Sequence, residues 1–143
     1  MKNYVPLELS DDEDNYSLTM YANYKNKFYK KHGCKCTGYL LEAIARYYIR
    51  INKIADEAFD FDSENGMFCV YCKDKEMMED FARKFQKALI DEMFLKEALY
   101  SDEVRDELEQ YSSAKKNLLS MLFGKSNPLN TIDFDSRNNK NSY

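Results

Sequence analysis

The stretch that decides the fold is "EAFDFDSENGMFCVYC", residues 57–72. Phe59 and Phe61 alternate with acidic neighbours, so their side chains would share one face of a strand and the acids would share the other. The dipeptide Asn65-Gly66 predicts a hairpin turn, because both residues tolerate positive φ. The mostly apolar run after the turn predicts a second strand, buried on both faces.

The same stretch contains a Cys-x-x-Cys motif, Cys69 and Cys72, of the kind that zinc and redox sites use. In a strand, residues three apart point to opposite faces and lie about 10 Å apart along the axis. A zinc ion, which holds thiolates at about 2.3 Å, cannot be shared by side chains so placed, and a disulfide cannot join them. We therefore predict that Cys69 is a core residue and that Cys72 is a thiol at the strand end.

A second group of candidate ligands, His32, Cys34 and Cys36, lies in the segment "HGCKC". This irregular segment could fold around an ion, with Cys72 or an acidic residue as the fourth ligand that zinc requires. Alternatively, the segment is an exposed basic loop with incidental thiols, which is the interpretation we favour. A Cys/His zinc-binding module stays an alternative, while we expect no catalytic, cofactor-binding or metal-binding residues.

The periodicity elsewhere predicts what packs with this hairpin. Residues 4–10 and 16–23 alternate apolar and polar positions, and the acidic run 11–15 between them suits the turn of a first hairpin. Thr37 and Asp74 are expected to cap two long helices. The positions expected to face the core are Leu40, Leu41, Ile44, Ala45, Tyr48 and Ile51 in the first helix, and Met77, Met78, Phe81, Phe85 and Leu89 in the second.

Beyond these helices the sequence predicts more helical structure and then a tail. A short helix is expected at residues 93–99, and Ser101 would cap a helical extension, residues 101–124, that stops at a glycine. Residues 125–143 predict a flexible tail. The expected fold class is therefore α+β: a small antiparallel sheet built from two hairpins and packed against three or four helices, in a single domain at residues 1–124.

Charge is distributed unevenly along the chain. The net charge is −4, but residues 25–53 carry eight Lys or Arg and a single acid, which leaves 13 basic and 24 acidic residues elsewhere. Residues 24–36 interleave Lys with Tyr24, Phe28 and Tyr29, an arrangement that can hold phosphates and stack bases. A small nucleic-acid-binding protein is thus an alternative, although the pI of about 5.1 and the lack of a recognisable reader motif argue against it.

Several other function classes lack their usual signals in the sequence. There is one histidine, and neither a phosphate-binding loop nor a Gly-x-Ser-x-Gly elbow is present, so we do not expect an enzyme. The N-terminus lacks the apolar region of a signal peptide, and no apolar run approaches the length of a membrane span. We therefore expect a cytoplasmic protein with reduced thiols and no membrane partner.

Two blocks of the sequence resemble a known family. "GYLLEAIARYYI", residues 38–49, and "FDFDSENGMFCVYCKDKEMMEDFARKF", residues 59–85, together resemble the immunity protein 51 family of bacterial polymorphic toxin systems. The matching positions are Gly38, Tyr39, Glu42, Ala45 and Arg46 in the first block, and Asp62, Glu64, Met67, Phe68, Cys69 and Tyr71 in the second. Leu41 stands where the family pattern has Trp, and Cys72 where it has a small polar residue. The resemblance covers residues 4–100.

The resemblance implies a cytoplasmic protein that binds and neutralises a cognate toxin domain by direct contact. Acidic surface would complement the basic substrate-binding surface of a nuclease toxin. The candidate partner-binding residues are Asp11, Asp12, Glu13, Asp14, Asp60, Asp62 and Glu64, with Asp56 and Glu57 beside them and Asp102, Glu103, Asp106 and Glu107 as a further patch. Exposed tyrosines would supply anchors, and an unpaired hairpin edge would permit a homodimer.

Overall fold

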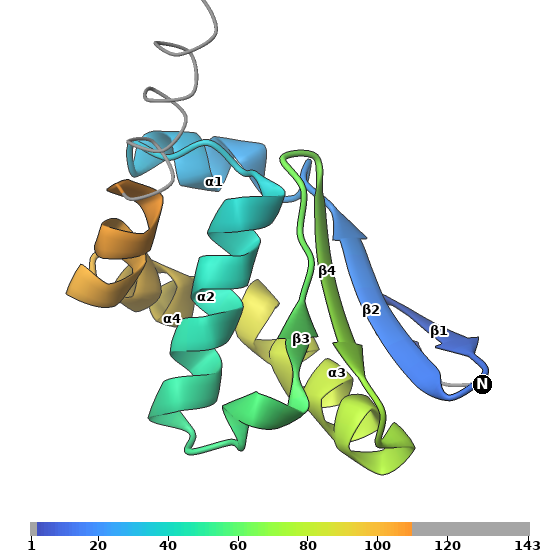
Figure 1. The fold of residues 1–143 in the computed structure, drawn as a ribbon. Coiled ribbons are helices and arrows are strands. Elements are labelled where there is room, and N and C mark those ends of the chain that lie inside the picture. The colour runs from blue at the N-terminus through green and yellow to red at the C-terminus, as the bar shows by residue number, and fades with distance from the viewer. Residues whose placement is uncertain (1–2, 110–143) are drawn as a thin grey trace, which may run out of the picture. The chain divides into compact units, whose positions relative to one another are not determined.

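The computed structural model describes residues 3–109, which form an antiparallel sheet with helices packed on one of its faces (Figure 1). In chain order the elements are β1 (Glu8–Asp12), β2 (Asn15–Tyr21), α1 (Asn26–Lys31), α2 (Gly38–Ile51), the 3-10 turn η1 (Asp56–Ala58), β3 (Asp60–Phe61), β4 (Met67–Cys72), α3 (Lys75–Ile90) and α4 (Glu92–Leu99). Another helix begins at residue 102. The predicted α+β class is confirmed. Most of the predicted extension 101–124 and all of the tail 125–143 lie outside the described residues, so those boundaries stay predictions.

The sheet has four strands in the order β1-β2-β4-β3, so β2 and β4 are its central strands. The register places Leu9, Leu18, Val70 and Phe61 in one row across all four strands. Leu18 and Val70, in the middle of that row, are fully buried. Helices α2 and α3 cover this face, and α4 packs against both of them (Figure 1). The apolar side of each hairpin therefore faces the helices, as the alternation requires.

The first hairpin is tighter than predicted. Asp12 pairs with Asn15, which leaves Glu13 and Asp14 as the whole turn. Glu13 takes the left-handed conformation, with a φ of 54°. The predicted turn at residues 11–15 was too wide because β1 is an edge strand, where acidic side chains can stay in water while the backbone pairs.

The turn of the second hairpin lies at Asn65-Gly66, as predicted, and Glu64 and Met67 close it with backbone hydrogen bonds of 2.8 and 3.2 Å. Neither turn residue adopts positive φ, so the turn does not use the conformational tolerance on which the prediction was based. Tertiary contact holds the turn instead: the carbonyl of Asn65 accepts a hydrogen bond of 2.8 Å from the amide of Gly38, at the start of α2.

Both long helices begin at the predicted caps. The Thr37 hydroxyl accepts a hydrogen bond of 3.0 Å from the amide of Leu40, and the Asp74 carboxylate accepts one of 3.1 Å from the amide of Met77. Every predicted core residue of α3 is buried or half-buried. No helix within residues 3–109 has the length and apolar character needed to cross a membrane.

Helix α2 is buried on more sides than the predicted stripe of core residues would cover. Ile51, predicted to face the core, is 40% exposed, whereas Tyr47 and Ile49 are buried. The reason is that α2 lies between the sheet and α4, so that residues on both sides of the helix find partners (Figure 1). The ring of Tyr47, for example, lies 6.0 Å from that of Phe94 in α4.

Residues 24–36, for which no helix or strand was predicted, contain the short helix α1. Phe28 packs against the core and Tyr29 is fully buried, so the apolar side chains of this basic segment determine its conformation. The ammonium group of Lys25 forms an ion pair of 3.1 Å with Glu92 of α4, which ties the segment to the helices.

Candidate protein-binding face

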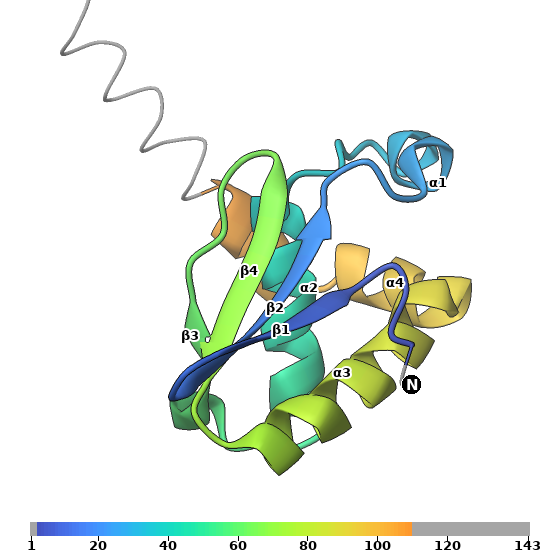
Figure 2. The same cartoon turned by 90° about the vertical axis from the view of Figure 1, so that its right-hand side faces the viewer.

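One face of the sheet is not covered by any helix of the described residues (Figure 2). The register fixes which side chains occupy it, because residues directly paired across strands share a face. Its two central rows are Ser10, Ser17, Tyr71 and Asp60, and Glu8, Thr19, Cys69 and Asp62. Tyr21 and Met67 form a further pair, and Tyr21 is 67% exposed. We call this surface the outer face.

The outer face is acidic because of the segments that build the sheet. Residues 3–24 and 54–72, which contain all the strands, hold ten Asp or Glu and no Lys, Arg or His. The basic residues of 25–53 lie on α1, α2 and the loops that flank them, on the helical side of the sheet (Figure 1). The uneven charge along the chain is therefore also an uneven charge in space.

Tyr71 and Cys69 are neighbours on the outer face, and a hydrogen bond between their side chains raises the pKa of Tyr71. Burial raises the pKa of the Cys69 thiol, because Cys69 is only 8% exposed. Cys69 is thus buried, as predicted, but on the face away from the helices. Cys72 pairs with Tyr16 and joins the apolar core on the other face. The two thiols lie on opposite faces, as strand geometry requires.

Three of the predicted partner-binding residues come together around one tyrosine. Asp60 pairs directly with Tyr71, and the charges of Asp62 and Asp12 contribute to its raised pKa. Glu8 lies on the same face and was missed by the sequence prediction. Its signal was its position between two leucines, which places its side chain opposite theirs on the strand.

The other predicted partner-binding residues lie elsewhere on the sheet. Asp11 pairs with Tyr16, in the row that belongs to the helical side. Glu13 and Asp14 form the exposed turn of the first hairpin. Glu64 sits at the second hairpin turn, at the opposite end of β4 from Tyr71. The predicted residues therefore form one cluster and several flanking positions rather than a single patch.

A hollow of about 500 Å³ opens at the end of the outer face, where β4 ends and η1, β3 and α3 begin. Tyr71, Ala58 and Met77 provide ring and apolar surface, and the charged residues Glu57, Asp60 and Lys73 also line it. The carboxylates of Glu57 and Asp60 have no hydrogen-bond or ion-pair partner among the described residues. We call this cavity the end hollow.

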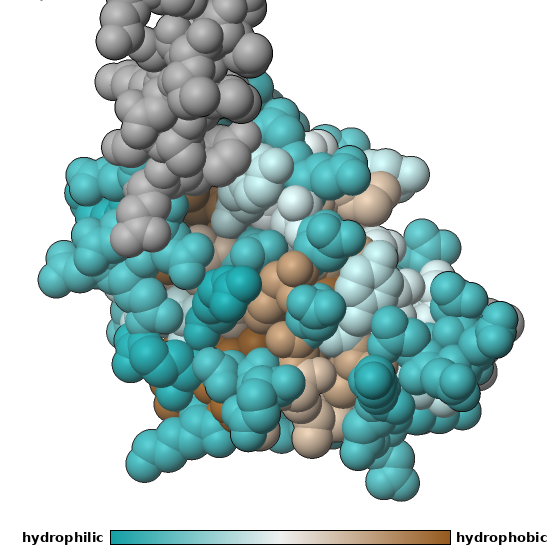
Figure 3. Space-filling view, in the orientation of Figure 1, coloured by the Kyte–Doolittle hydropathy of each residue, from teal (hydrophilic) through white to brown (hydrophobic). Residues whose placement is uncertain are grey.

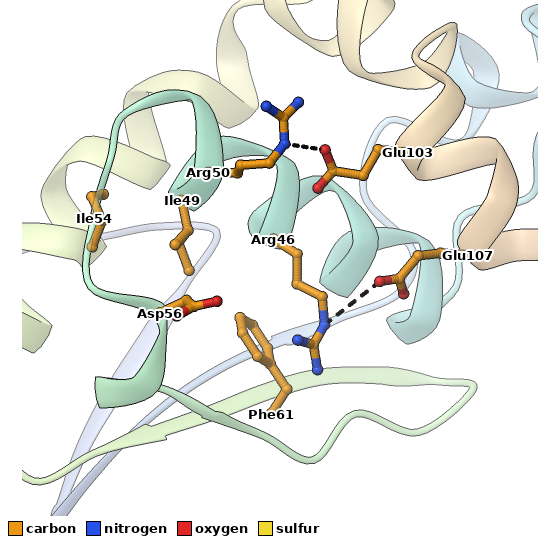
Figure 4. A pocket seen from close by; sticks show the side chains of 8 residues that line it. All are labelled: Arg46, Ile49, Arg50, Ile54, Asp56, Phe61, Glu103 and Glu107. Carbon is orange, nitrogen blue, oxygen red and sulfur yellow. Dashed lines mark hydrogen bonds and ion pairs between the residues drawn. The ribbon is translucent and has the colours of Figure 1, made fainter.

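A second hollow, of about 410 Å³, lies between α2, β3 and the helix that begins at residue 102 (Figure 4). Apolar surface from Ile49, Ile54 and Phe61 lines it, and apolar surface shows between α2 and β3 when the molecule is viewed as in Figure 1 (Figure 3). We call it the side hollow.

The two arginines of the side hollow are already paired with glutamates. The guanidinium group of Arg46 lies 3.1 Å from the carboxylate of Glu42 and 4.0 Å from that of Glu107. It also lies 4.5 Å from the centre of the Phe61 ring, which is a cation–π contact. Arg50 is paired with Glu103 (Figure 4). These pairs join α2 to the next helix and to the sheet edge, so we interpret the side hollow as a structural junction.

The two sequence blocks that carry the family resemblance meet in space, since Arg46 contacts Phe61 and Gly38 contacts Asn65. The family model for immunity protein 51 matches residues 7–104. This chain belongs to the immunity protein 51 family. The match spans all four strands and helices α1 to α4, and it contains the whole outer face. Searches of curated proteins and of solved structures each found no match.

In this immunity-family chain the candidate metal ligands do not converge. His32 Nδ1 lies 3.0 Å from the hydroxyl of Tyr100, the Cys34 thiol faces a backbone carbonyl at 3.7 Å, and Cys36 is buried in the core. Within residues 3–109, no three His, Cys, Asp or Glu side chains are grouped so that they could hold a metal ion. All four thiols are free, and burial is the main cause that raises the pKa of each.

In the basic segment of this family member, one aromatic ring is fully buried and two are partly buried against the core. Tyr29 is fully buried, Tyr24 packs against the core, and the ring of Phe28 lies 4.8 Å from that of His32. Base stacking requires free aromatic faces. The packing of these rings therefore argues against nucleic-acid binding through residues 24–36.

Proposed function

We propose that this chain neutralises a toxin effector of a polymorphic toxin system by binding it directly, and that the outer face is the contact surface. Membership of the immunity family supplies the class of function. The observation that carries the choice of surface is the charge of the outer face, which carries Glu8, Asp12, Asp60 and Asp62 and whose strands contain no Lys, Arg or His. A surface of one sign attracts and orients a partner of the opposite sign.

The proposed contact residues follow from the geometry of the outer face. Asp12, Asp60 and Asp62, grouped around Tyr71, would form its charged centre. Tyr21, which is 67% exposed, would supply an anchor, since tyrosine offers a large contact area at low entropic cost. The remaining predicted residues, Asp11, Glu13, Asp14 and Glu64, would lie at the periphery of the contact.

Neutralisation by contact needs no catalytic group. The raised pKa values of the four thiols favour the protonated form, which is a poor nucleophile. The single histidine, His32, is held against Tyr100 on the helical side. We therefore propose a non-enzymatic inhibitor that acts in the cytoplasm, where its thiols would stay reduced.

The test is a co-expression experiment with the toxin domain encoded beside this chain. We expect the wild-type chain to restore growth and the purified proteins to form a complex in a calorimetric titration. A variant with Asp12→Asn, Asp60→Asn and Asp62→Asn should bind more weakly. A control with Asp102→Asn and Asp106→Asn removes charges of the other predicted patch, which lies on the helical side, and should bind normally if the outer face is the contact surface.

Two negative results would have different meanings. If the wild-type chain neither binds the toxin domain nor protects cells that make it, the proposed function is wrong. If the wild-type chain protects but the outer-face variant binds with unchanged affinity, the surface is wrong and the function stands. Sedimentation of the free chain would test whether it forms a homodimer, which the unpaired edge of β1 within the described residues would permit.

A further inference from the structure

We propose that the end hollow receives an arginine or lysine side chain of the toxin. This inference rests on the proposed function, because it specifies how the same face would hold its partner. The hollow is bordered by Asp60 and Tyr71, which belong to the central rows of the outer face. A protein docked on that face would therefore reach the hollow without passing any other described element.

The walls of the end hollow suit a long basic side chain. Ala58 and Met77 offer apolar surface to the methylene stem, which basic side chains bury while their charge stays hydrated or paired. The ring of Tyr71 forms another wall, and an aromatic face attracts a cation within about 6 Å. The volume of about 500 Å³ admits a side chain together with the backbone that carries it.

Two carboxylates of the end hollow are unpaired within the described residues, whereas the arginines of the side hollow are paired. The carboxylates of Glu57 and Asp60 have no partner among the described residues, so both can accept hydrogen bonds from a guanidinium or ammonium group. Asp74 also lines the hollow, but its carboxylate already accepts the amide of Met77 at the start of α3. Lys73 is the one cation among the lining residues, and it would compete with an incoming charge.

The first test uses a defined probe instead of the toxin. The isotope-labelled full chain is titrated with the peptide acetyl-Gly-Arg-Gly-amide and, separately, with its citrulline analogue, which has the same shape without the charge. We expect the arginine peptide to shift the NMR signals of residues that line the end hollow, and the citrulline peptide to shift them far less. Equal shifts with both peptides would overturn the inference. Shifts in the helix that begins at residue 102 that are as large as those at the end hollow would also overturn it.

Variants of the hollow separate a binding effect from misfolding. Glu57→Gln with Asp60→Asn should weaken binding of the arginine peptide about fivefold or more, since each exposed ion pair contributes modestly. Lys73→Gln should strengthen binding severalfold, and a gain of affinity cannot result from a damaged fold. Asp106→Asn is the control: it removes an acid of the other predicted patch, which does not line the end hollow, and it should not change binding of the peptide. Unchanged affinity in the first two variants would refute the proposed role.

The same variants are then measured against the neighbouring toxin domain. If the wild-type chain binds the toxin and the Glu57→Gln, Asp60→Asn variant binds it about fivefold or more weakly, the inference is supported. If that variant binds as tightly as wild type, the hollow is not part of the contact, although the proposed function stands. If the wild-type chain does not bind the toxin at all, the proposed function fails, and the peptide titration still decides whether the hollow accepts arginine.

Discussion

The backbone amide of Gly38 donates a hydrogen bond of 2.8 Å to the carbonyl oxygen of Asn65. This contact joins the first residue of α2 to the turn between β3 and β4. A Cβ atom at position 38 would lie 1.9 Å from the carbonyl oxygen of Glu64 and 2.3 Å from that of Met67. Because both atoms belong to the backbone of a closed hairpin turn, they cannot move aside, and only glycine fits.

Gly38→Ala should therefore lower the free energy of unfolding by about 2 kcal/mol or more, because the added methyl group must push the helix away from the turn. Urea denaturation of the purified variant would measure the loss. Gly66→Ala is the matched control, since a Cβ there meets no atom within 4 Å and the residue does not need positive φ. The control should stay within about 0.5 kcal/mol of wild type, and equal losses in both variants would contradict the steric explanation.

The contact between Arg46 and Phe61 should be measurable as a coupling energy. In a double-mutant cycle of Arg46→Ala and Phe61→Leu, the lost ion pairs with glutamates cancel, and the cation–π term remains. We expect a coupling of about 0.5–1 kcal/mol in unfolding free energy. Arg50 provides the control, because its guanidinium group lies over the ring of Tyr47 instead, 5.6 Å from its centre. Arg50→Ala and Phe61→Leu should be additive, and additivity in the first cycle would contradict the assignment.

The features of the fold that were predicted correctly depend on short-range chemistry. The caps at Thr37 and Asp74 and the turn at Asn65-Gly66 depend on residues within a few positions of one another. Helix α1 was not predicted because its conformation depends on the burial of Tyr29 against distant parts of the chain. The burial of Tyr47 on the second side of α2 likewise depends on α4, which the periodicity of one helix does not reveal.

The candidate site shows the same division. Asp60 and Asp62 were correctly expected to share a strand face, because side chains alternate between the two faces along a strand. Which acid of the first hairpin lies near Tyr71 depends on the strand register. The observed two-residue turn gives a different register from the one that the predicted turn at residues 11–15 implies. The end hollow could not be predicted at all, because Glu57 and Met77 come from segments that only the tertiary fold brings together.

Alkaline pH should destabilise the protein through its buried thiols. Burial raises the pKa values of Cys36, Cys69 and Cys72 above their ordinary value of 9.0. Above about pH 9 the unfolded chain therefore loses protons that the folded chain keeps, so the free energy of unfolding falls as the pH rises. Burial also raises the pKa of Tyr29 far above its ordinary value of 10.0, which should steepen the loss beyond pH 10.

Unfolding curves in urea between pH 7 and pH 10.5 would measure this dependence. Below about pH 8 these groups are protonated in both states, so they should contribute no slope. A Cys36→Ala variant should show a shallower decline above pH 9, because it has one buried thiol fewer. A free energy of unfolding that stays constant through pH 10 would show that the thiols are not shielded in the folded state.

Metal chelation should leave the fold intact. No group of three potential ligands converges within residues 3–109, so we expect no structural ion to contribute to the stability of that part of the chain. We expect the melting temperature to be the same with and without excess EDTA or 1,10-phenanthroline. A zinc content near one ion per purified chain, together with a lower melting temperature after chelation, would restore the zinc alternative around His32.

The charge of the outer face should appear in the kinetics of toxin binding. If acids on this face steer a basic partner, the association rate constant should fall about tenfold between low and high salt, while dissociation changes less. Asp60→Asn and Asp62→Asn together should reduce both the association rate constant at low salt and its salt dependence. Asp106→Asn, on the helical side, serves as the control and should leave both unchanged. Surface plasmon resonance with the immobilised toxin domain would measure these rates, and a salt dependence that is identical in all variants would place the electrostatic contact elsewhere.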